Sequence, residues 1–100
     1  MEKLAYSQKE INQSRMSTRS FKKLAKEFGW TMRMPVEHGY CAEIKGPNKT
    51  WITCNEYEDG ILSGFEILSK GANGSYTRRV HANHVRRMME MYQEWNQPGV

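Results

Sequence analysis

The chain has 100 residues and a formal net charge of +4, a length that suits one domain and is too short for two hydrophobic cores. Leu, Ile, Val and Phe supply only 16 residues, so the core must also draw on the seven Met, three Trp and five Tyr residues. These figures exclude a disulfide scaffold, a coiled coil, a repeat array and a large multi-layer α/β enzyme, and they leave a small α+β domain.

Charge is distributed unevenly along the chain. Residues 1–33 carry a formal charge of +5, residues 34–75 carry −3 and residues 76–100 carry +2. Basic ends around an acidic middle are typical of a protein with an anionic partner, although solvated helix faces produce the same pattern. No apolar stretch reaches the roughly 18 residues of a membrane span, and the first eight residues lack the apolar core of a signal peptide. We therefore expect a soluble cytoplasmic protein that makes no membrane contact.

The first element is a short helix. Ser7 and Glu10 have the spacing of a capping box, which predicts a helix to about Met16. Few apolar residues lie in this segment, so it could also be an arm that is mobile until it meets a partner. We expect three parts: an arm or short helix over residues 1–16, one α+β domain over residues 17–96 and a tail over residues 97–100.

A second helix ends at Gly29, a natural helix stop. Its apolar residues recur at i, i+3, i+4 and i+7: Phe21, Leu24, Ala25 and Phe28. Residues 24–29 superficially resemble the first helix and turn of a helix-turn-helix, but Pro35 would break the second helix of that motif. We expect Trp30–Met34 to form a short edge strand instead.

Three turn pairs in the middle of the chain predict an antiparallel four-stranded meander. The pairs are Pro47-Asn48, Asp59-Gly60 and Asn73-Gly74. The strands they separate are residues 40–46, 50–58, 61–71 and 76–80.

The turns also predict how the strands pair. The first turn, with Gly46 opposite Lys49, places Cys41 directly opposite Cys54. The second places Cys54 opposite Phe65, and the third places Ile67 opposite Val80.

In these registers both faces of the meander are partly apolar. One face carries Tyr40, Ala42, Ile44, Trp51, Tyr57, Leu62 and Leu68, and the other carries Cys41, Ile52, Cys54, Ile61, Phe65, Ile67, Tyr76 and Val80. Each face then needs a cover, which predicts a helix on one and a second helix or another subunit on the other. A homodimer is one outcome of this pattern.

A closing amphipathic helix supplies one of these covers. Asn83 is the expected N-cap, and the apolar stripe that follows is Val85, Met88, Met89, Tyr92 and Trp95. Arg86 and Arg87 fall in the first helical turn, where the helix dipole disfavours cations and where an anionic partner would offset the cost.

The leading functional hypothesis is nucleic-acid binding through phosphate contacts at the two basic ends. The residues expected to make these contacts are Arg19, Lys22, Lys23, Lys26, Arg33, Arg79, Arg86 and Arg87. Trp30 and Tyr76 border the basic segments and are the candidates for stacking on unpaired bases.

The alternative is a protein-binding inhibitory or regulatory module, like those of small phage or mobile-element proteins, that binds a larger protein such as a nucleic-acid-processing enzyme. An acidic hairpin tip could mimic phosphates toward a basic partner. The residues for this role are Glu56, Glu58, Asp59 and the exposed Met91.

Metal binding and catalysis have less support. Five residues have soft ligand atoms, namely His38, Cys41, Cys54, His81 and His84, but no Cys-x-x-Cys knuckle gathers them into a zinc site. Two reduced core thiols are the simpler interpretation of the cysteines, with zinc as the alternative. The chain has no phosphate loop, nucleophile elbow or paired-carboxylate motif. We therefore expect a binding protein without a cofactor, and not an enzyme.

Overall fold

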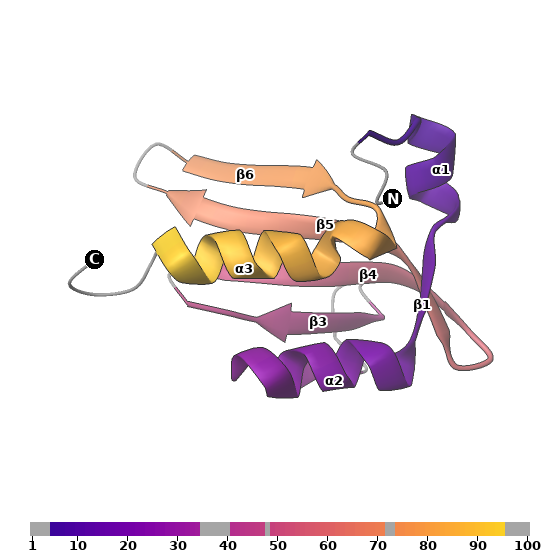
Figure 1. Cartoon of the computed structure of the whole chain (residues 1–100), viewed down its shortest axis with the longest axis horizontal. Coiled ribbons are helices and arrows are strands. Elements are labelled where there is room, and N and C mark those ends of the chain that lie inside the picture. The colour runs from indigo at the N-terminus through magenta and orange to yellow at the C-terminus, as the bar shows by residue number, and fades with distance from the viewer. Residues whose placement is uncertain (1–4, 35–40, 48, 72–73, 96–100) are drawn as a thin grey trace.

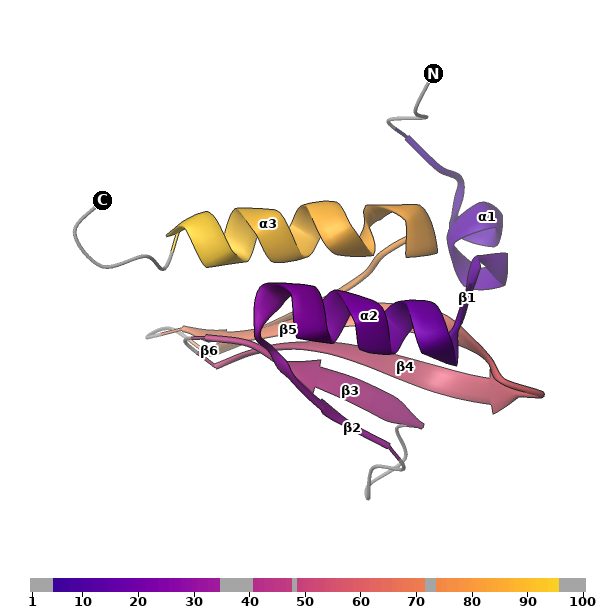
Figure 2. The same ribbon diagram turned by 60° about the horizontal axis from the view of Figure 1, so that its bottom comes forward.

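The computed structural model describes residues 5–34, 41–47, 49–71 and 74–95. Over these residues the chain forms an α+β fold, as the sequence predicted. An antiparallel six-stranded sheet has the order β1-β5-β4-β3-β2, with β6 also paired to β5. The helices lie on one side of this sheet, as Figures 1 and 2 show.

The predicted capping box opens the first helix, α1 (Gln8–Gln13). The Ser7 hydroxyl accepts from the Glu10 N–H at 3.1 Å, and the Glu10 carboxylate accepts from the Ser7 N–H at 3.0 Å. The helix ends before Met16, which belongs instead to a short strand, β1 (Arg15–Ser17), paired with β5. A three-residue strand is too short to produce a hydrophobic period, and the sequence did not predict it.

The second helix, α2 (Thr18–Phe28), begins at Ser17, whose hydroxyl accepts from the Ser20 N–H at 3.1 Å. It ends at Gly29, which adopts the left-handed conformation with φ +73° that glycine tolerates best. The expected edge strand follows as β2 (Thr31–Arg33), the last strand in the sheet order.

The central strands match the predicted meander, and one of its registers is confirmed in full. They are β3 (Ala42–Lys45), β4 (Thr50–Glu58), β5 (Ile61–Gly71) and β6 (Gly74–Arg79). In the β4–β5 hairpin, Cys54 lies opposite Phe65 and Trp51 opposite Leu68.

The predicted β3–β4 register is wrong by one residue. Gly46 donates to the Thr50 carbonyl at 2.8 Å, so the turn holds three residues and Lys49 takes a positive φ of 58°. Cys54 therefore faces Ala42 and not Cys41. A one-residue slip sends every side chain of a strand to the other face, so Ala42 and Ile44 join the apolar side of the sheet.

The β5–β6 register differs by two residues, because Ile67 lies opposite Arg78 and not opposite Val80. A slip of two preserves the faces. Within β5, Gly64 has φ +70°, and Leu62 and Phe65 on either side of it are both completely buried in one core. Strict alternation would send these two residues to opposite faces, so the turn of the backbone at Gly64 brings Leu62 inward.

The closing helix is preceded by a single 3-10 turn, η1 (Ala82–His84), and runs as α3 (Val85–Trp95). The N-cap is His81 and not Asn83: the His81 Nδ1 atom accepts from the Asn83 N–H at 3.0 Å. Among the described residues no helix is long and apolar enough to cross a bilayer.

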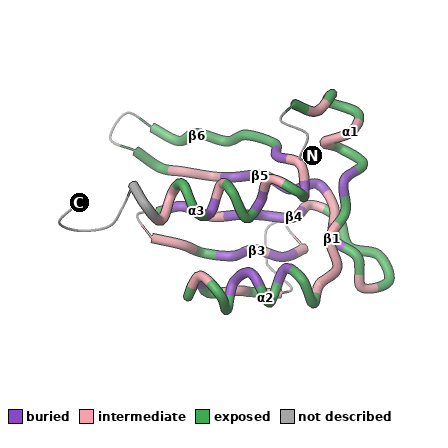
Figure 3. The backbone as a smooth tube through the Cα atoms, in the orientation of Figure 1, coloured by how far each residue is buried: buried purple, intermediate pink, exposed green. Residues whose placement is uncertain are grey.

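One hydrophobic core lies between the sheet and the helices, and the tube in Figure 3 shows the buried residues along their facing sides. Its members are Phe21, Leu24, Ala25, Trp30, Ala42, Ile44, Ile52, Cys54, Leu62, Phe65, Ile67, Val80, Ala82, Val85 and Met89. The corrected register moves Ala42 and Ile44 to the core side. Trp51 and Leu68, which lie opposite each other and are half-buried, stay on the opposite face, so that face is still partly apolar. In the structure a polar row crosses the opposite face, formed by residues that lie side by side on successive strands: Arg33, Glu43, Thr53, Glu66 and Arg79.

Candidate functional site

Helix α2 carries two opposed stripes of side chains. The buried stripe packs on the sheet through Phe21, Leu24 and Ala25. Four exposed cations repeat the same i, i+3, i+4, i+7 spacing two residues earlier: Arg19, Lys22, Lys23 and Lys26. At 3.6 residues per turn this spacing places them together on the side of the helix that faces solvent.

Helix α3 lies beside α2 on the same side of the sheet, as both ribbon views show. Arg86 joins the two helices: its guanidinium binds both carboxylate oxygens of Glu27, with the Nη2–Oε1 contact at 3.0 Å. The same guanidinium lies 5.7 Å from the ring centroid of Phe28. The basic ends of the chain therefore meet in one helical layer. We call its exposed cations the basic surface: Arg19, Lys22, Lys23, Lys26, Arg86 and Arg87.

Both side chains of the Glu27–Arg86 pair are held in their charged forms. The hydrogen bonds from Arg86 hold the pKa of Glu27 below its ordinary value, and the nearby ammonium of Lys23 adds to this effect. The same hydrogen bonds raise the pKa of Arg86. Glu27 thus offsets part of the positive charge of the basic surface. It is the carboxylate that relieves the cost of an arginine in the first turn of α3.

Two of the predicted phosphate contacts lie elsewhere. Arg33 and Arg79 belong to the polar row on the opposite face, where Arg33 pairs with Glu43 at 3.8 Å and Arg79 with Glu66 at 3.4 Å. The structure therefore divides the eight predicted cations into six on the helical layer and two across the sheet from it.

The two residues predicted to stack on bases differ in how far they are exposed. Trp30 is only 6% exposed and belongs to the core, so its ring has no free face for a base and this expectation is wrong. The ring packs edge-on against Phe28, with centroids 6.4 Å apart. Tyr76 is 47% exposed on β6, where its ring remains accessible.

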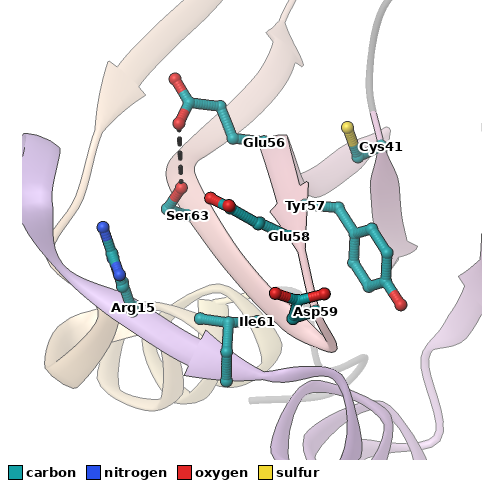
Figure 4. Close-up of a pocket in the computed structure, with 8 residues that line it drawn as sticks. All are labelled: Arg15, Cys41, Glu56, Tyr57, Glu58, Asp59, Ile61 and Ser63. Carbon is teal, nitrogen blue, oxygen red and sulfur yellow. Dashed lines mark hydrogen bonds between the residues drawn. The ribbon is translucent and has the colours of Figure 1, made fainter.

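The three predicted acidic residues gather at a second place. Glu56, Glu58 and Asp59 line an open cavity of about 610 Å³ at the tip of the β4–β5 hairpin, which we call the acidic pocket. Figure 4 shows Arg15 reaching it from β1 and the Ser63 hydroxyl pointing at Glu56, to which it donates at 3.3 Å. The other lining residues are Cys41, Tyr57 and Ile61. Met91 is 39% exposed on α3 and does not line this pocket.

The cysteines do not face each other. Cys54 is completely buried on the core side, and this burial raises the pKa of its thiol. Cys41 lies on the other side of the sheet and donates through Sγ to the Asn55 carbonyl at 3.4 Å. Both thiols are free, and the alternation of strand side chains separates them.

The histidines of the zinc alternative make other contacts. The ring of His81 stacks on Tyr6 with centroids 3.8 Å apart, and His84 meets the same tyrosine edge-on at 4.9 Å. His38 lies outside the described residues. Within the described ranges, no three His, Cys, Asp or Glu side chains are placed to hold a metal ion.

Sequence reasoning missed two residues that shape these surfaces. Glu27 neutralises part of the basic surface through a partner 59 positions away. Arg15 lines the acidic pocket because β1 pairs with β5. Neither contact leaves a local pattern in the sequence. Comparisons with protein families, with curated proteins and with solved structures found nothing that matches this chain.

Proposed function

We propose that this protein binds nucleic acid through phosphate contacts made by the basic surface. The observation that supports this proposal is the convergence of α2 and α3 on one side of the sheet, joined by Glu27 and Arg86. Together the two helices carry six cations and three acids. Residues 50–71, which form β4, β5 and their turn, carry four acids and one cation. The molecule is therefore polarised between a basic helical layer and an acidic hairpin, which would orient it on a polyanion.

Flexible lysines dominate the exposed stripe of α2. Lysine acts as a point charge toward phosphate and lacks the bidentate geometry with which arginine reads a guanine edge. Binding through this stripe would therefore depend strongly on salt and weakly on base sequence.

The test compares two charge-matched double variants. Lys23→Gln with Lys26→Gln removes two cations from the basic surface. Lys45→Gln with Lys49→Gln removes two cations from strand β3 and the β3–β4 turn. Glutamine keeps the helix propensity of lysine, so α2 should remain folded. Fluorescence anisotropy with single-stranded and duplex oligonucleotides is measured over a salt series.

We expect the first pair to weaken binding and to reduce the slope of log K against log salt by about two. The second pair should leave both quantities near their wild-type values. Equal effects of the two pairs, or no binding at low salt, would contradict the proposal.

A second candidate function is supported by the acidic pocket. We propose that a basic segment of a partner protein could bind there, because Glu56, Glu58 and Asp59 line one cavity beside the exposed Tyr57 and Ile61. Carboxylates next to apolar side chains suit a lysine or arginine with its aliphatic stem.

The test is a pull-down from nuclease-treated lysate with wild-type protein and with Glu58→Gln/Asp59→Asn. A partner retained by the wild type and by Glu90→Gln, but lost by the double variant, would favour this function. Loss of all partners after nuclease treatment would favour the first.

A further inference from the structure

Strand β6 is an open edge of the sheet. It pairs with β5 on one side, and no other strand of the described chain pairs with it. All six of its residues, Gly74–Arg79, are exposed, and Figure 3 shows this edge exposed along its length. An edge strand presents a row of backbone donors and acceptors that can pair with another strand.

The register shows which backbone groups point outward. The Val80 N–H donates to the Phe65 carbonyl at 3.0 Å and extends the β5–β6 register in which Ile67 lies opposite Arg78. In an antiparallel ladder, residues alternate between hydrogen-bonded and non-hydrogen-bonded pairs. Tyr76 and Arg78 therefore bond toward β5, and the N–H and C=O groups of Ser75, Thr77 and Arg79 face away from it.

We propose that two copies of this chain pair through β6, antiparallel, about a two-fold axis at Thr77. Thr77 then lies opposite Thr77 of the second copy, and Ser75 lies opposite Arg79. Both pairs use the outward backbone groups of the odd-numbered residues. The two β6 strands would join the two sheets into one continuous sheet.

The side chains select this register among the possible ones. A two-fold axis at Arg79 would place two arginines directly opposite each other, which is unfavourable. An axis at Ser75 would leave the arginine end of each strand unpaired. With the axis at Thr77, Tyr76 of each copy faces Arg78 of the other copy. The interface then contains two such pairs, and each is suited to a cation–π contact. Arg79 is already held within its own chain by Glu66 at 3.4 Å and by the Asn12 side chain at 3.1 Å.

A two-fold axis perpendicular to the sheet has a consequence for binding, and this consequence alone rests on the proposed function. Both helical layers would lie on the same side of the joined sheet. A polyanion could then contact two basic surfaces in one complex, which raises avidity when both sites can be spanned.

The first test measures the oligomeric state by light scattering and sedimentation over a concentration series. Thr77→Pro removes an outward N–H and leaves the hydrogen bonds to β5 intact, and prolines are accepted on edge strands. Thr77→Ala removes the same side chain and keeps the N–H. We expect dimers for the wild type and Thr77→Ala, and a folded monomer for Thr77→Pro. A monomeric wild type at every concentration, or a dimeric Thr77→Pro, would overturn the proposal.

A second test fixes the register by cross-linking in a Cys41→Ser background. Residues in a hydrogen-bonded antiparallel pair have Cα atoms about 5.5 Å apart, within the range of a disulfide. Thr77→Cys should therefore form a covalent dimer on mild oxidation. Ser75→Cys should not, because the two Ser75 positions lie four residues apart along the paired strands. Cross-linking by Ser75→Cys alone would overturn the Thr77 register. Neither test uses nucleic acid, so failure of the dimer and failure of the proposed function are distinguishable.

Discussion

Glu27 on α2 and Arg86 on α3 form a two-pronged ion pair, although 59 positions separate them in the sequence. The carboxylate side chain is 42% exposed and the guanidinium 48% exposed, so water screens the pair. The pair links α2 to α3 through side chains. It also sets how much positive charge the basic surface presents.

The Glu27–Arg86 pair predicts a pH-dependent contribution to stability. The pKa of Glu27 lies below its ordinary value of 4.5 because Arg86 hydrogen-bonds the charged carboxylate. A carboxylate with a lowered pKa stabilises the fold above its ordinary pKa, and this stabilisation is lost as the pH falls through the folded value. We expect Glu27→Gln to melt slightly below the wild type at neutral pH, with a gap that closes under acid conditions.

Thermal melts from neutral pH to about pH 3, which lies below the ordinary carboxylate pKa, measure this gap. Glu58→Gln at the hairpin tip is the control, because the same change of charge there breaks no bond between helices. A gap that persists unchanged in acid would show that Glu27 acts through packing and not through its charge.

Ser14 connects the N-terminal helix to the start of the closing helical segment. Its hydroxyl donates to the Ile11 carbonyl at 2.7 Å and accepts from the Ala82 N–H at 3.0 Å, and the residue is buried. Ser14→Ala would leave the Ala82 N–H buried without an acceptor, at a cost of about 1–3 kcal/mol. Urea denaturation measures this loss. Ser63→Ala, which removes an exposed hydrogen bond to Glu56, should change stability by less than about 0.5 kcal/mol.

The parts of the fold that the sequence predicted have strong local signals. Asp59-Gly60 allows one tight turn, so the β4–β5 register was predictable residue by residue. Pro47-Asn48 looked like a two-residue turn, but Lys49 adopts a positive φ and makes the loop one residue longer. Non-glycine residues rarely take this conformation, so nothing in the sequence marks it. That single residue changed the face of Ala42 and Ile44.

The candidate site was predictable as a set of residues but not as an arrangement. The cationic spacing on α2 is visible in the sequence, because four exposed cations follow the helical repeat. The placement of Arg33 and Arg79 on the opposite face depends on the pairing of distant strands. The burial of Trp30 likewise depends on contacts between segments far apart in the sequence, such as the close approach of Gly46 to its ring.

The cysteines predict a clear difference in chemical reactivity. Cys54 is completely buried and burial raises its pKa, which lowers the fraction of reactive thiolate. Cys41 is half-buried and lines the acidic pocket. We expect iodoacetamide to modify Cys41 in the native protein and Cys54 only after denaturation, as measured by peptide mass spectrometry. Equal labelling of both thiols under native conditions would mean that β3 opens readily from β4.

Gly46 predicts a sharp steric limit at the junction of the sheet and Trp30. A Cβ atom added at Gly46 would lie 2.6 Å from three carbons of the Trp30 ring. That ring is buried in the core and cannot move away without displacing its neighbours. We expect Gly46→Ala to destabilise the fold by about 1–3 kcal/mol, the range of an overpacked core. The matched control is Gly71→Ala on β5, where the nearest atom would lie 3.9 Å away in ordinary contact. Gly71→Ala should be close to neutral in the same denaturation experiment. If Gly46→Ala proved as stable as the control, Trp30 would have room to shift, and the close approach of the β3–β4 turn to its ring would not be required for the fold.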